Sequence, residues 1–204
     1  MTSLLQLNSP TDVMVLVLAA GRGERFSVSG GAGHKLDAVL AGQSVLSHVL
    51  NAVEAAGLKS FLVRPEGGTA GMGESIAMGV RATANAPAWM ILPGDLPLIR
   101  ASTIRQVAQA LVENPIVVPN WRSRRGHPVG FQRQYFAELA ALQGDTGASV
   151  IVRGNKLLGR VLELSVEDAG AIIDVDTCDD LTLARHLLQI RQTSDFEGEP
   201  NGKY

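Results

Sequence analysis

The sequence predicts a single-domain α/β protein in which a mostly parallel, Rossmann-like sheet forms the middle of three α/β/α layers. Short apolar runs alternate with helix-like segments between residues 13 and 118, as parallel strands alternate with the helices that connect them. The first run, residues 13–20, is apolar throughout and ends before a glycine, which is typical of a strand buried on both faces. At 204 residues the chain has the length of one such domain.

The remaining elements can be assigned in order along the chain. Further strands are expected at residues 61–63, 89–92, 116–118 and 172–175, with a strand fragment at residues 129–131. Helices are expected at residues 44–56, from about Ser75 onward, from Ser102 or Thr103 to Val112, and at residues 179–190. Pro119 is expected to end the fourth strand, and Ser102 or Thr103 to cap the helix before it.

The other segments are predicted to be irregular. Residues 21–41 and 67–73 are rich in glycine and are expected to form loops. Residues 120–160 break the alternation and are interpreted as an insertion beside the ligand site. The domain is expected to span residues 13–190, between flexible termini at 1–12 and 193–204.

Composition excludes several functional classes. A net charge of −2 argues against broad attraction to nucleic acid. The longest apolar run has eight residues, fewer than the roughly 20 that a membrane helix needs. The single cysteine, Cys178, allows neither an internal disulfide nor a multi-thiolate zinc site. With no export signal at the N-terminus, the expected location is the cytoplasm.

The strongest local signal is the segment LAAGRGERF, residues 18–26, followed by Lys35. A strand that ends in glycine lets backbone amides approach phosphate oxygens. The residues expected to contact a nucleotide here are Leu18, Ala19, Ala20, Gly21 and Gly23. Positions 22–35 hold three basic residues and one glutamate, so Arg25 and Lys35 are expected to offset polyphosphate charge. A flexible, solvated basic loop is the alternative.

Two other phosphate-binding motifs do not fit this segment. A dinucleotide-binding turn needs a third glycine where Phe26 stands, and no helix is expected to begin in the glycine-rich stretch that follows. A Walker A loop needs a GK[ST] triplet, which the sequence lacks.

Aspartates follow two of the expected strands. Asp95 lies in LPGDLP, and Asp174 and Asp176 lie in DVDTCDD, two residues apart and therefore on one face of an extended segment. Magnesium needs only one or two protein carboxylates beside a triphosphate, so Asp95 and one of the later aspartates are candidate ligands. The alternatives are a turn aspartate at position 95 and a helix cap at Asp176 or Thr177.

Three further motifs are candidates for substrate contacts. In GMGES, Gly71 and Gly73 precede an expected helix start at Ser75, where amides and a hydroxyl can hold a base or ribose. A loop with a capping serine is the alternative reading. RSRRGHPVGF, residues 122–131, and GDTGA, residues 144–148, are interpreted as the polar edges of a pocket. Arg124, Arg125 and His127 are expected to bind an anionic acceptor there, with a solvated hairpin as the alternative, and Asp145 is also expected to contact the acceptor.

In this order the motifs resemble those of the MocA and MobA group of molybdenum cofactor nucleotidyltransferases, which have a GT-A-like nucleotidyltransferase fold. The resemblance runs from about residue 13 to residue 188 through LAAG with its arginine and lysine, GMGES, PGDLP, RGHPVGF, GDTGA and DVDT. LAAG rather than LAGG, together with RGHPV, is similar to the cytidylyltransferase branch.

The resemblance implies transfer of CMP from CTP to a molybdopterin-type cofactor, with release of pyrophosphate. It implies that Arg25 and Lys35 hold the triphosphate, that Asp95 binds Mg²⁺ and that Asp176 makes a second contact with the metal. A molybdoenzyme or its chaperone is a further expected partner, and neither nucleic acid nor a membrane is expected.

The sequence departs from the family pattern at three places. Residues 27–34 lengthen the loop before Lys35, Cys178 replaces a common proline, and Ser149 replaces a common arginine. Two alternatives therefore stay open. One is transfer from GTP or another NTP to a different phosphorylated acceptor, and the other is a non-catalytic nucleotide- or cofactor-binding module that serves a molybdoenzyme.

Overall fold

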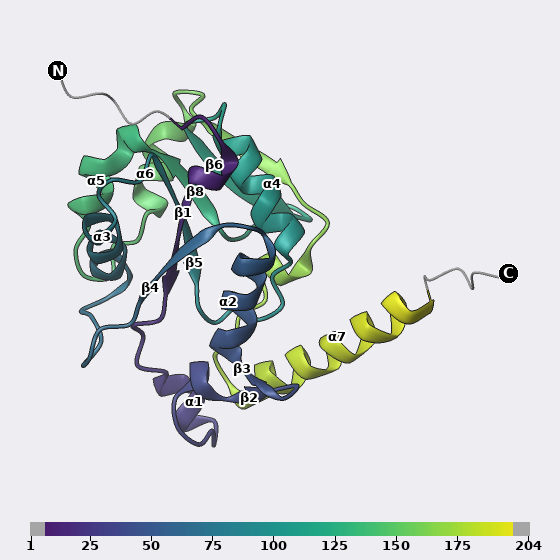
Figure 1. Cartoon of the computed structure of the whole chain (residues 1–204). Coiled ribbons are helices and arrows are strands. Elements are labelled where there is room, and N and C mark those ends of the chain that lie inside the picture. The colour runs from purple at the N-terminus through teal and green to yellow at the C-terminus, as the bar shows by residue number, and fades with distance from the viewer. Residues whose placement is uncertain (1–6, 198–204) are drawn as a thin grey trace, which may run out of the picture.

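The computed structural model describes residues 7–197, with side chains as far as Arg191, and confirms the three-layer α/β/α architecture (Figure 1). Within these residues the main sheet has seven strands, in the order β4-β1-β5-β8-β6-β7, and β9 pairs with β6. A separate hairpin joins β2 (Val39–Leu40) to β3 (Gln43–Ser44).

Strand β1 (Met14–Leu18) lies between β4 (Lys59–Val63) and β5 (Ala88–Pro93), and all three strands are parallel. In register, Leu18 lies between Val63 and Pro93. The carboxyl ends of the three strands therefore meet at one edge, where open α/β sheets bind their ligands. The first three predicted strands are confirmed.

The other half of the sheet contains the antiparallel strands. β8 (Val129–Gln132) pairs antiparallel with both β5 and β6 (Ile116–Trp121), and the short β7 (Arg124–Arg125) turns back on β6. On its other side β6 pairs in parallel with β9 (Val161–Ser165). The sheet is mixed but mostly parallel, as predicted.

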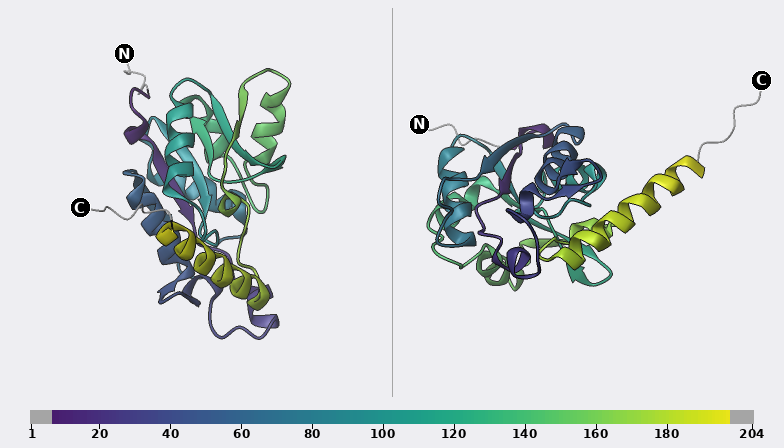
Figure 2. Two further views of the ribbon diagram at one scale, coloured as in Figure 1. Left: turned by 90° about the vertical axis from the view of Figure 1, so that its right-hand side faces the viewer. Right: turned by 90° about the horizontal axis from the view of Figure 1, so that it is seen from below.

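Helices cover both faces of the sheet (Figure 2). One core contains residues of α2 (Val45–Ala55) and α4 (Ala101–Leu111), and the other those of α3 (Met72–Ala82), α5 (Phe136–Ala140) and α6 (Ser149–Lys156). Val15 and Val17 of β1 enter the first core and Leu16 the second. Because alternate side chains serve different cores, a central strand must be apolar at every position.

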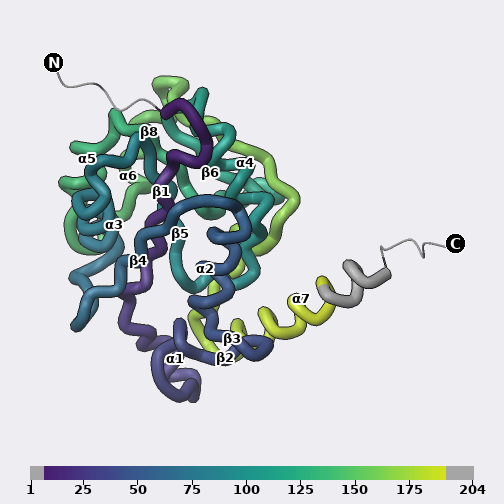
Figure 3. Tube along the Cα trace, in the orientation of Figure 1, coloured from purple at the N-terminus to yellow at the C-terminus, as the bar shows by residue number. Residues whose placement is uncertain are grey.

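Two of the smaller elements lie beyond the carboxyl ends of the parallel strands. α1 (Glu24–Val28) and the β2–β3 hairpin lie beside the start of α7 (Cys178–Glu197), which then leads away from the sheet (Figure 3). Within residues 7–197 four short 3₁₀ helices are also formed, at Pro10–Asp12, Lys35–Asp37, Arg133–Tyr135 and Ala169–Ala171.

The termini differ in part from the expected flexible segments. Leu7 is buried and the 3₁₀ helix Pro10–Asp12 is formed, and α7 continues to Glu197 rather than ending at residue 190. Residues 1–6 and 198–204 lie outside the described part of the chain. Within residues 7–197, no helix combines the length and the apolar character that crossing a membrane requires.

The predicted strand at residues 172–175 is wrong, and the last parallel strand is β9. In β9 the partly buried Leu162 alternates with the exposed Glu163, so this edge strand lacks the continuous apolar run of a central strand. Residues 172–175 are irregular although Val175 is fully buried, and the Val175 amide donates to the Asp95 carbonyl at 2.9 Å. This bond brings the aspartate-rich segment to the end of β5.

Two further predictions are wrong because tertiary contacts outweigh the local effects of proline and glycine on secondary structure. Strand β6 continues through Pro119 to Trp121, since the Pro119 carbonyl still accepts a hydrogen bond from the Gly126 amide at 2.8 Å. The glycine-rich stretch 21–41 contains α1, where Phe26 is only 2% exposed. Burial of this one aromatic side chain stabilises a single turn in a segment of poor helix formers.

Neither Ser102 nor Thr103 caps α4. The N-cap position is Arg100, whose amide donates to the Asp168 carboxylate at 2.9 Å, and Thr103 donates its hydroxyl to the same carboxylate at 2.7 Å. Asp168 is 2% exposed and also accepts from the Gly170 amide at 2.9 Å and from Arg191 at 3.4 Å. One buried carboxylate thus connects the start of α4 to Arg191 of α7.

We expect Asp168→Ala to lower the free energy of unfolding by about 3 kcal/mol, because it leaves several buried donors without an acceptor. Asp168→Asn keeps one acceptor oxygen and should lose less. Urea unfolding measures both, with the exposed Asp12→Ala as a control expected to change stability by about 0.5 kcal/mol or less. Equal losses at positions 12 and 168 would contradict the anchoring role.

Candidate active site

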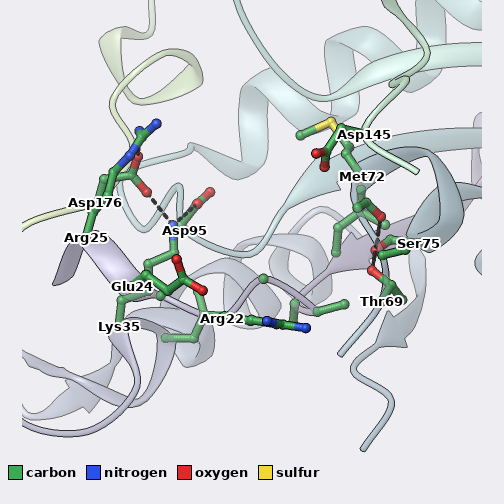
Figure 4. Close-up of a pocket in the computed structure, with 18 residues that line it drawn as sticks. Arg22, Glu24, Arg25, Lys35, Thr69, Met72, Ser75, Asp95, Asp145 and Asp176 are labelled. Carbon is green, nitrogen blue, oxygen red and sulfur yellow. Dashed lines mark hydrogen bonds and ion pairs between the residues drawn. The ribbon is translucent and has the colours of Figure 1, made fainter. Parts of the chain in front are cut away.

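A cavity of about 680 Å³ opens at the carboxyl ends of β1 and β5 (Figure 4). The predicted site residues that line it are Leu18, Ala19, Ala20, Gly21, Gly23, Arg25, Lys35, Gly71, Ser75, Asp95, Asp145 and Asp176. The charged residues Lys35, Asp95 and Asp176 lie on one side of this cavity and Thr69 and Ser75 on the other (Figure 4). Segments far apart in sequence therefore meet around one space.

The loop after β1 presents free backbone amides to this cavity. The Ala19 amide donates to the Val63 carbonyl at 2.9 Å, which holds the end of the strand. No described group accepts a hydrogen bond from the amides of Gly21, Arg22 or Gly23. Gly23 has a φ of +67°, which favours glycine, and a Cβ there would come within 3.4 Å of Lys35. Free amides of this kind are suited to phosphate oxygens.

A cluster of two cations and two carboxylates forms the charged side. The Lys35 ammonium contacts Asp95 at 2.6 Å and Asp176 at 2.5 Å, and Arg25 contacts the other oxygen of Asp176 at 2.9 Å. The lysine side chain is only 12% exposed, so solvent screens its contacts less than those of a surface ion pair. Lys35 reaches the cavity despite the lengthened loop at residues 27–34.

The cluster fixes the charges of its members. Burial alone would lower the pKa of Lys35, but Asp95 and Asp176 outweigh burial and raise it above its ordinary value. Burial would raise the pKa of Asp176, but Lys35 and Arg25 hold it below the ordinary range. The lysine is therefore cationic and the aspartate anionic at neutral pH.

The donor set of Asp95 and Asp176 fits a hard divalent cation. Both carboxylates approach one point, since each lies within 2.6 Å of the same lysine nitrogen. No group of three His, Cys, Asp or Glu side chains within residues 7–197 is arranged to hold a metal by itself. Two carboxylates are sufficient for magnesium when phosphate oxygens and water supply the remaining ligands. Asp174 is exposed and does not line the cavity.

The GMGES motif contributes Gly71 and Ser75 to the cavity lining, and its helix start also packs against another loop. α3 begins at Met72, and the amides of Gly73 and Glu74 donate to the Gly144 carbonyl at 2.8 and 3.3 Å. A Cβ on Gly73 would lie 2.3 Å from the Thr146 carbonyl oxygen. The helix start is therefore packed against the GDTGA loop, and Gly73 does not line the cavity.

Ser75 is not a helix cap either, because it lies inside α3 and is 4% exposed. Its hydroxyl donates to the Gly71 carbonyl at 3.1 Å and lies 2.7 Å from the Thr69 hydroxyl. The hydroxyl therefore already has partners within the protein, and it joins the two ends of the segment before α3.

A second cavity, of about 330 Å³, adjoins the first and shares Met72 and Asp145 with it. The predicted acceptor residues Arg125, His127 and Asp145 all line it, whereas Arg124 does not. Its other walls are mainly apolar and come from α3, β5, β6, β8 and α6, with Ile76, Ile91 and Val152 among the side chains.

The charges of this second cavity differ from the expectation. Burial lowers the pKa of His127 despite a hydrogen bond to Ile91 and the charge of Asp95, so the ring is neutral and is not an anion-binding cation. Its Nδ1 is buried without a partner. Arg125 contacts Glu163 at 2.9 Å, so a neighbouring carboxylate partly offsets its charge.

The sequence of residues 15–162 matches the MobA-like NTP transferase domain, over more than half of the chain. The chain belongs to the MobA-like NTP transferase family. It is thus a nucleotidyltransferase, as the sequence motifs predicted. No curated protein matches the sequence.

Solved structures of related proteins share the fold of this MobA-like transferase. A homologue of Mycobacterium tuberculosis Rv0371c from Mycobacterium sp. strain JC1 is 26% identical, with a TM-score of 0.70 over 88% of this chain and 98% of its own. Rv0371c of M. tuberculosis in complex with manganese is 24% identical, with a TM-score of 0.66 over 85% and 98%. A nucleotidyl transferase from Methanothermobacter thermautotrophicus is 20% identical, with a TM-score of 0.72 over 87% and 98%.

Thr69 and Met72 are among the cavity-lining residues of the MobA-like transferase that the sequence motifs did not single out. Thr69 lines the first cavity beside Ser75, and Met72 borders both cavities. Met72 is 46% exposed although it is apolar. Neither residue type carries a chemical signature, and only their position next to the GMGES glycines marks them.

We expect Gly73→Ala to destabilise the transferase by about 2 kcal/mol, because the added methyl group overlaps the loop that packs against α3. Urea unfolding provides the measurement. The matched control is Gly154→Ala in α6, where a Cβ meets no atom within 4 Å and alanine favours the helix by up to about 1 kcal/mol. A Gly73 variant as stable as the Gly154 variant would contradict the tight packing.

Proposed function

We propose that this transferase moves CMP from CTP to a molybdopterin-type cofactor and releases pyrophosphate. One observation carries the proposal: Lys35 binds Asp95 and Asp176 at the carboxyl edge of the sheet, next to the free amides of the loop after β1. Amides, cations and a pair of carboxylates around one cavity are the groups that phosphoryl transfer from a nucleotide requires.

In the proposed reaction, the terminal phosphate oxygen of the acceptor attacks the α-phosphorus of CTP in line with the bond to the β-phosphate. A new P–O bond forms to the acceptor while the bond to the bridging oxygen breaks, and the bond electrons leave with pyrophosphate. The ammonium of Lys35 has three donors, and two of them are used by the aspartates. The third donor is available to a phosphate oxygen, where it offsets the charge that develops on the leaving group.

The charge balance of the cluster makes nucleotide binding depend on a divalent cation. The two positive charges of Arg25 and Lys35 balance the two negative charges of Asp95 and Asp176, so the four side chains are neutral together. Asp95 and Asp176 would hold magnesium, and the ion would supply neutralisation of negative charge on the phosphate oxygens. The manganese complex of Rv0371c supports a divalent cation in this fold.

The second cavity is the proposed acceptor site. Its apolar walls suit a flat ring system, and the neutral His127 adds a polar group without adding charge. Arg125 and Asp145 lie among the lining residues, and Asp145 also borders the nucleotide cavity. A ligand that occupies both cavities passes Met72 and Asp145, where the two spaces adjoin. The choice of CTP rests on the LAAG and RGHPV motifs.

We expect Lys35→Ala or Asp95→Ala to lower turnover by about 10²-fold or more, because each removes a group that stabilises the transition state. Pyrophosphate release with CTP, magnesium and molybdopterin is the measurement. Lys59→Ala is the control, since Lys59 is exposed on β4 and does not line either cavity. Undiminished turnover in the Lys35 or Asp95 variant refutes the role assigned to that residue.

Incubation with each NTP, magnesium and molybdopterin, followed by mass analysis of the product, tests the choice of substrates. A CMP adduct of molybdopterin is the expected product. A GMP adduct, or a product formed only with another phosphorylated acceptor, identifies the alternative transferase reaction. Absence of magnesium-dependent pyrophosphate release with every NTP and acceptor favours the non-catalytic module.

A further inference from the structure

The lengthened loop between Arg25 and Lys35 is folded back on itself and tied to its surroundings. The Gly31 amide donates to the Phe26 carbonyl at 3.0 Å, and a Cβ on Gly31 would overlap the Phe26 ring at 2.2 Å. Ser29 donates its hydroxyl to the Phe26 carbonyl at 2.8 Å and accepts from the Cys178 amide at 3.0 Å. The inserted residues thus contact the start of α7, next to Asp176.

The last residue of this loop, His34, uses both of its ring nitrogens. Nε2 lies 2.6 Å from the Gly21 carbonyl oxygen, and Nδ1 accepts from the Leu36 amide at 3.2 Å. A carbonyl needs a donor and an amide needs an acceptor, so only the neutral ring with its proton on Nε2 makes both bonds. The ring therefore connects the loop after β1 to the 3₁₀ helix that carries Lys35.

The loop after β1 and the 3₁₀ helix Lys35–Asp37 both contribute groups to the nucleotide cavity, namely free amides and the lysine ammonium. Lys35 directly follows His34, and its ammonium contacts Asp95 and Asp176. Gly21 precedes Arg22, and in a planar trans peptide the Arg22 amide points away from the Gly21 carbonyl. Holding that carbonyl toward His34 therefore also sets the direction of a free amide of the loop. A Cβ on Gly23 would come within 3.6 Å of the His34 ring, so the two segments are in close contact.

We propose that His34 is a positioning residue that holds Lys35 and the Gly21–Arg22 peptide in place for the transferred nucleotide. This inference rests on the proposed function. The two hydrogen bonds of His34 fix the end of the lengthened loop next to Lys35. The lysine can therefore hold one position in the site although the loop before it is longer. His34 itself lies on the side of the Ala19–Arg22 loop that faces a smaller hollow of about 280 Å³, and it does not line the nucleotide cavity.

Two substitutions separate the bridge from a local capping role. In His34→Asn the side-chain oxygen can still accept from the Leu36 amide, but the side chain is too short to reach Gly21. In His34→Gln the longer side chain places an amide NH₂ near the Nε2 position and keeps the donor to Gly21. We expect His34→Asn to lower kcat by about tenfold, the cost of one lost positioning hydrogen bond. KM for the nucleotide should change by less than about threefold, and His34→Gln should keep kcat within about threefold of the wild type.

His48→Asn is the matched control, because His48 makes a similar Nε2 contact with the Leu40 carbonyl at 2.7 Å but lines none of the cavities. Its kcat should equal that of the wild type. Thermal melting of all variants accompanies the kinetics. Wild-type kcat in His34→Asn, or equal losses in the Asn and Gln variants, would overturn the positioning role while the wild-type reaction stands. A wild type that releases no pyrophosphate with any NTP overturns the proposed function, and the inference falls with it.

Discussion

The arrangement of the site depends on one interaction, the contact of the Lys35 ammonium with both Asp95 and Asp176. The three residues come from different segments of the chain. Without the lysine, the two carboxylates would repel each other at this edge of the sheet. A cation between them allows both to stay ionised and close together, which is what a divalent-ion site beside a polyphosphate requires. The bond from the Val175 amide to the Asp95 carbonyl supports the same arrangement through the backbone.

A second constraint joins the two adjoining cavities. The start of α3 packs so closely on the GDTGA loop that Gly71 and Gly73 tolerate no side chain, since a Cβ at either would lie within 2.3 Å of that loop. Met72 lies between these glycines, and Asp145 lies in the loop that they contact. Both residues border both cavities. The wall between the two cavities is therefore fixed by the close packing of the start of α3 on the GDTGA loop.

Sequence reasoning worked where chemistry is local. The apolar runs of β1 and β5 predicted central strands because burial on both faces demands apolar residues at every position. The charged residues Arg25, Lys35 and Asp95 likewise line one cavity, whereas their roles toward phosphate and magnesium stay predictions. The edge strand β9, the continuation of β6 through Pro119 and α1 were not predicted, because a neighbouring segment supplied the missing stabilisation.

The sequence by itself determined the alternation of the main strands and helices from β1 to β6, the apolar character of the central strands and the residue types available for phosphate and metal chemistry. The tertiary structure alone decided which of these residues meet, because the two carboxylates that contact Lys35 lie 60 and 141 positions further along the chain. The glycines of GMGES pack against a loop about seventy positions away, a contact that the motif itself does not reveal. The buried ring of His127 is neutral instead of cationic, and His34 spans two segments through its ring nitrogens. Burial and long-range hydrogen bonding set these roles, and neither can be read from the residues adjacent in sequence.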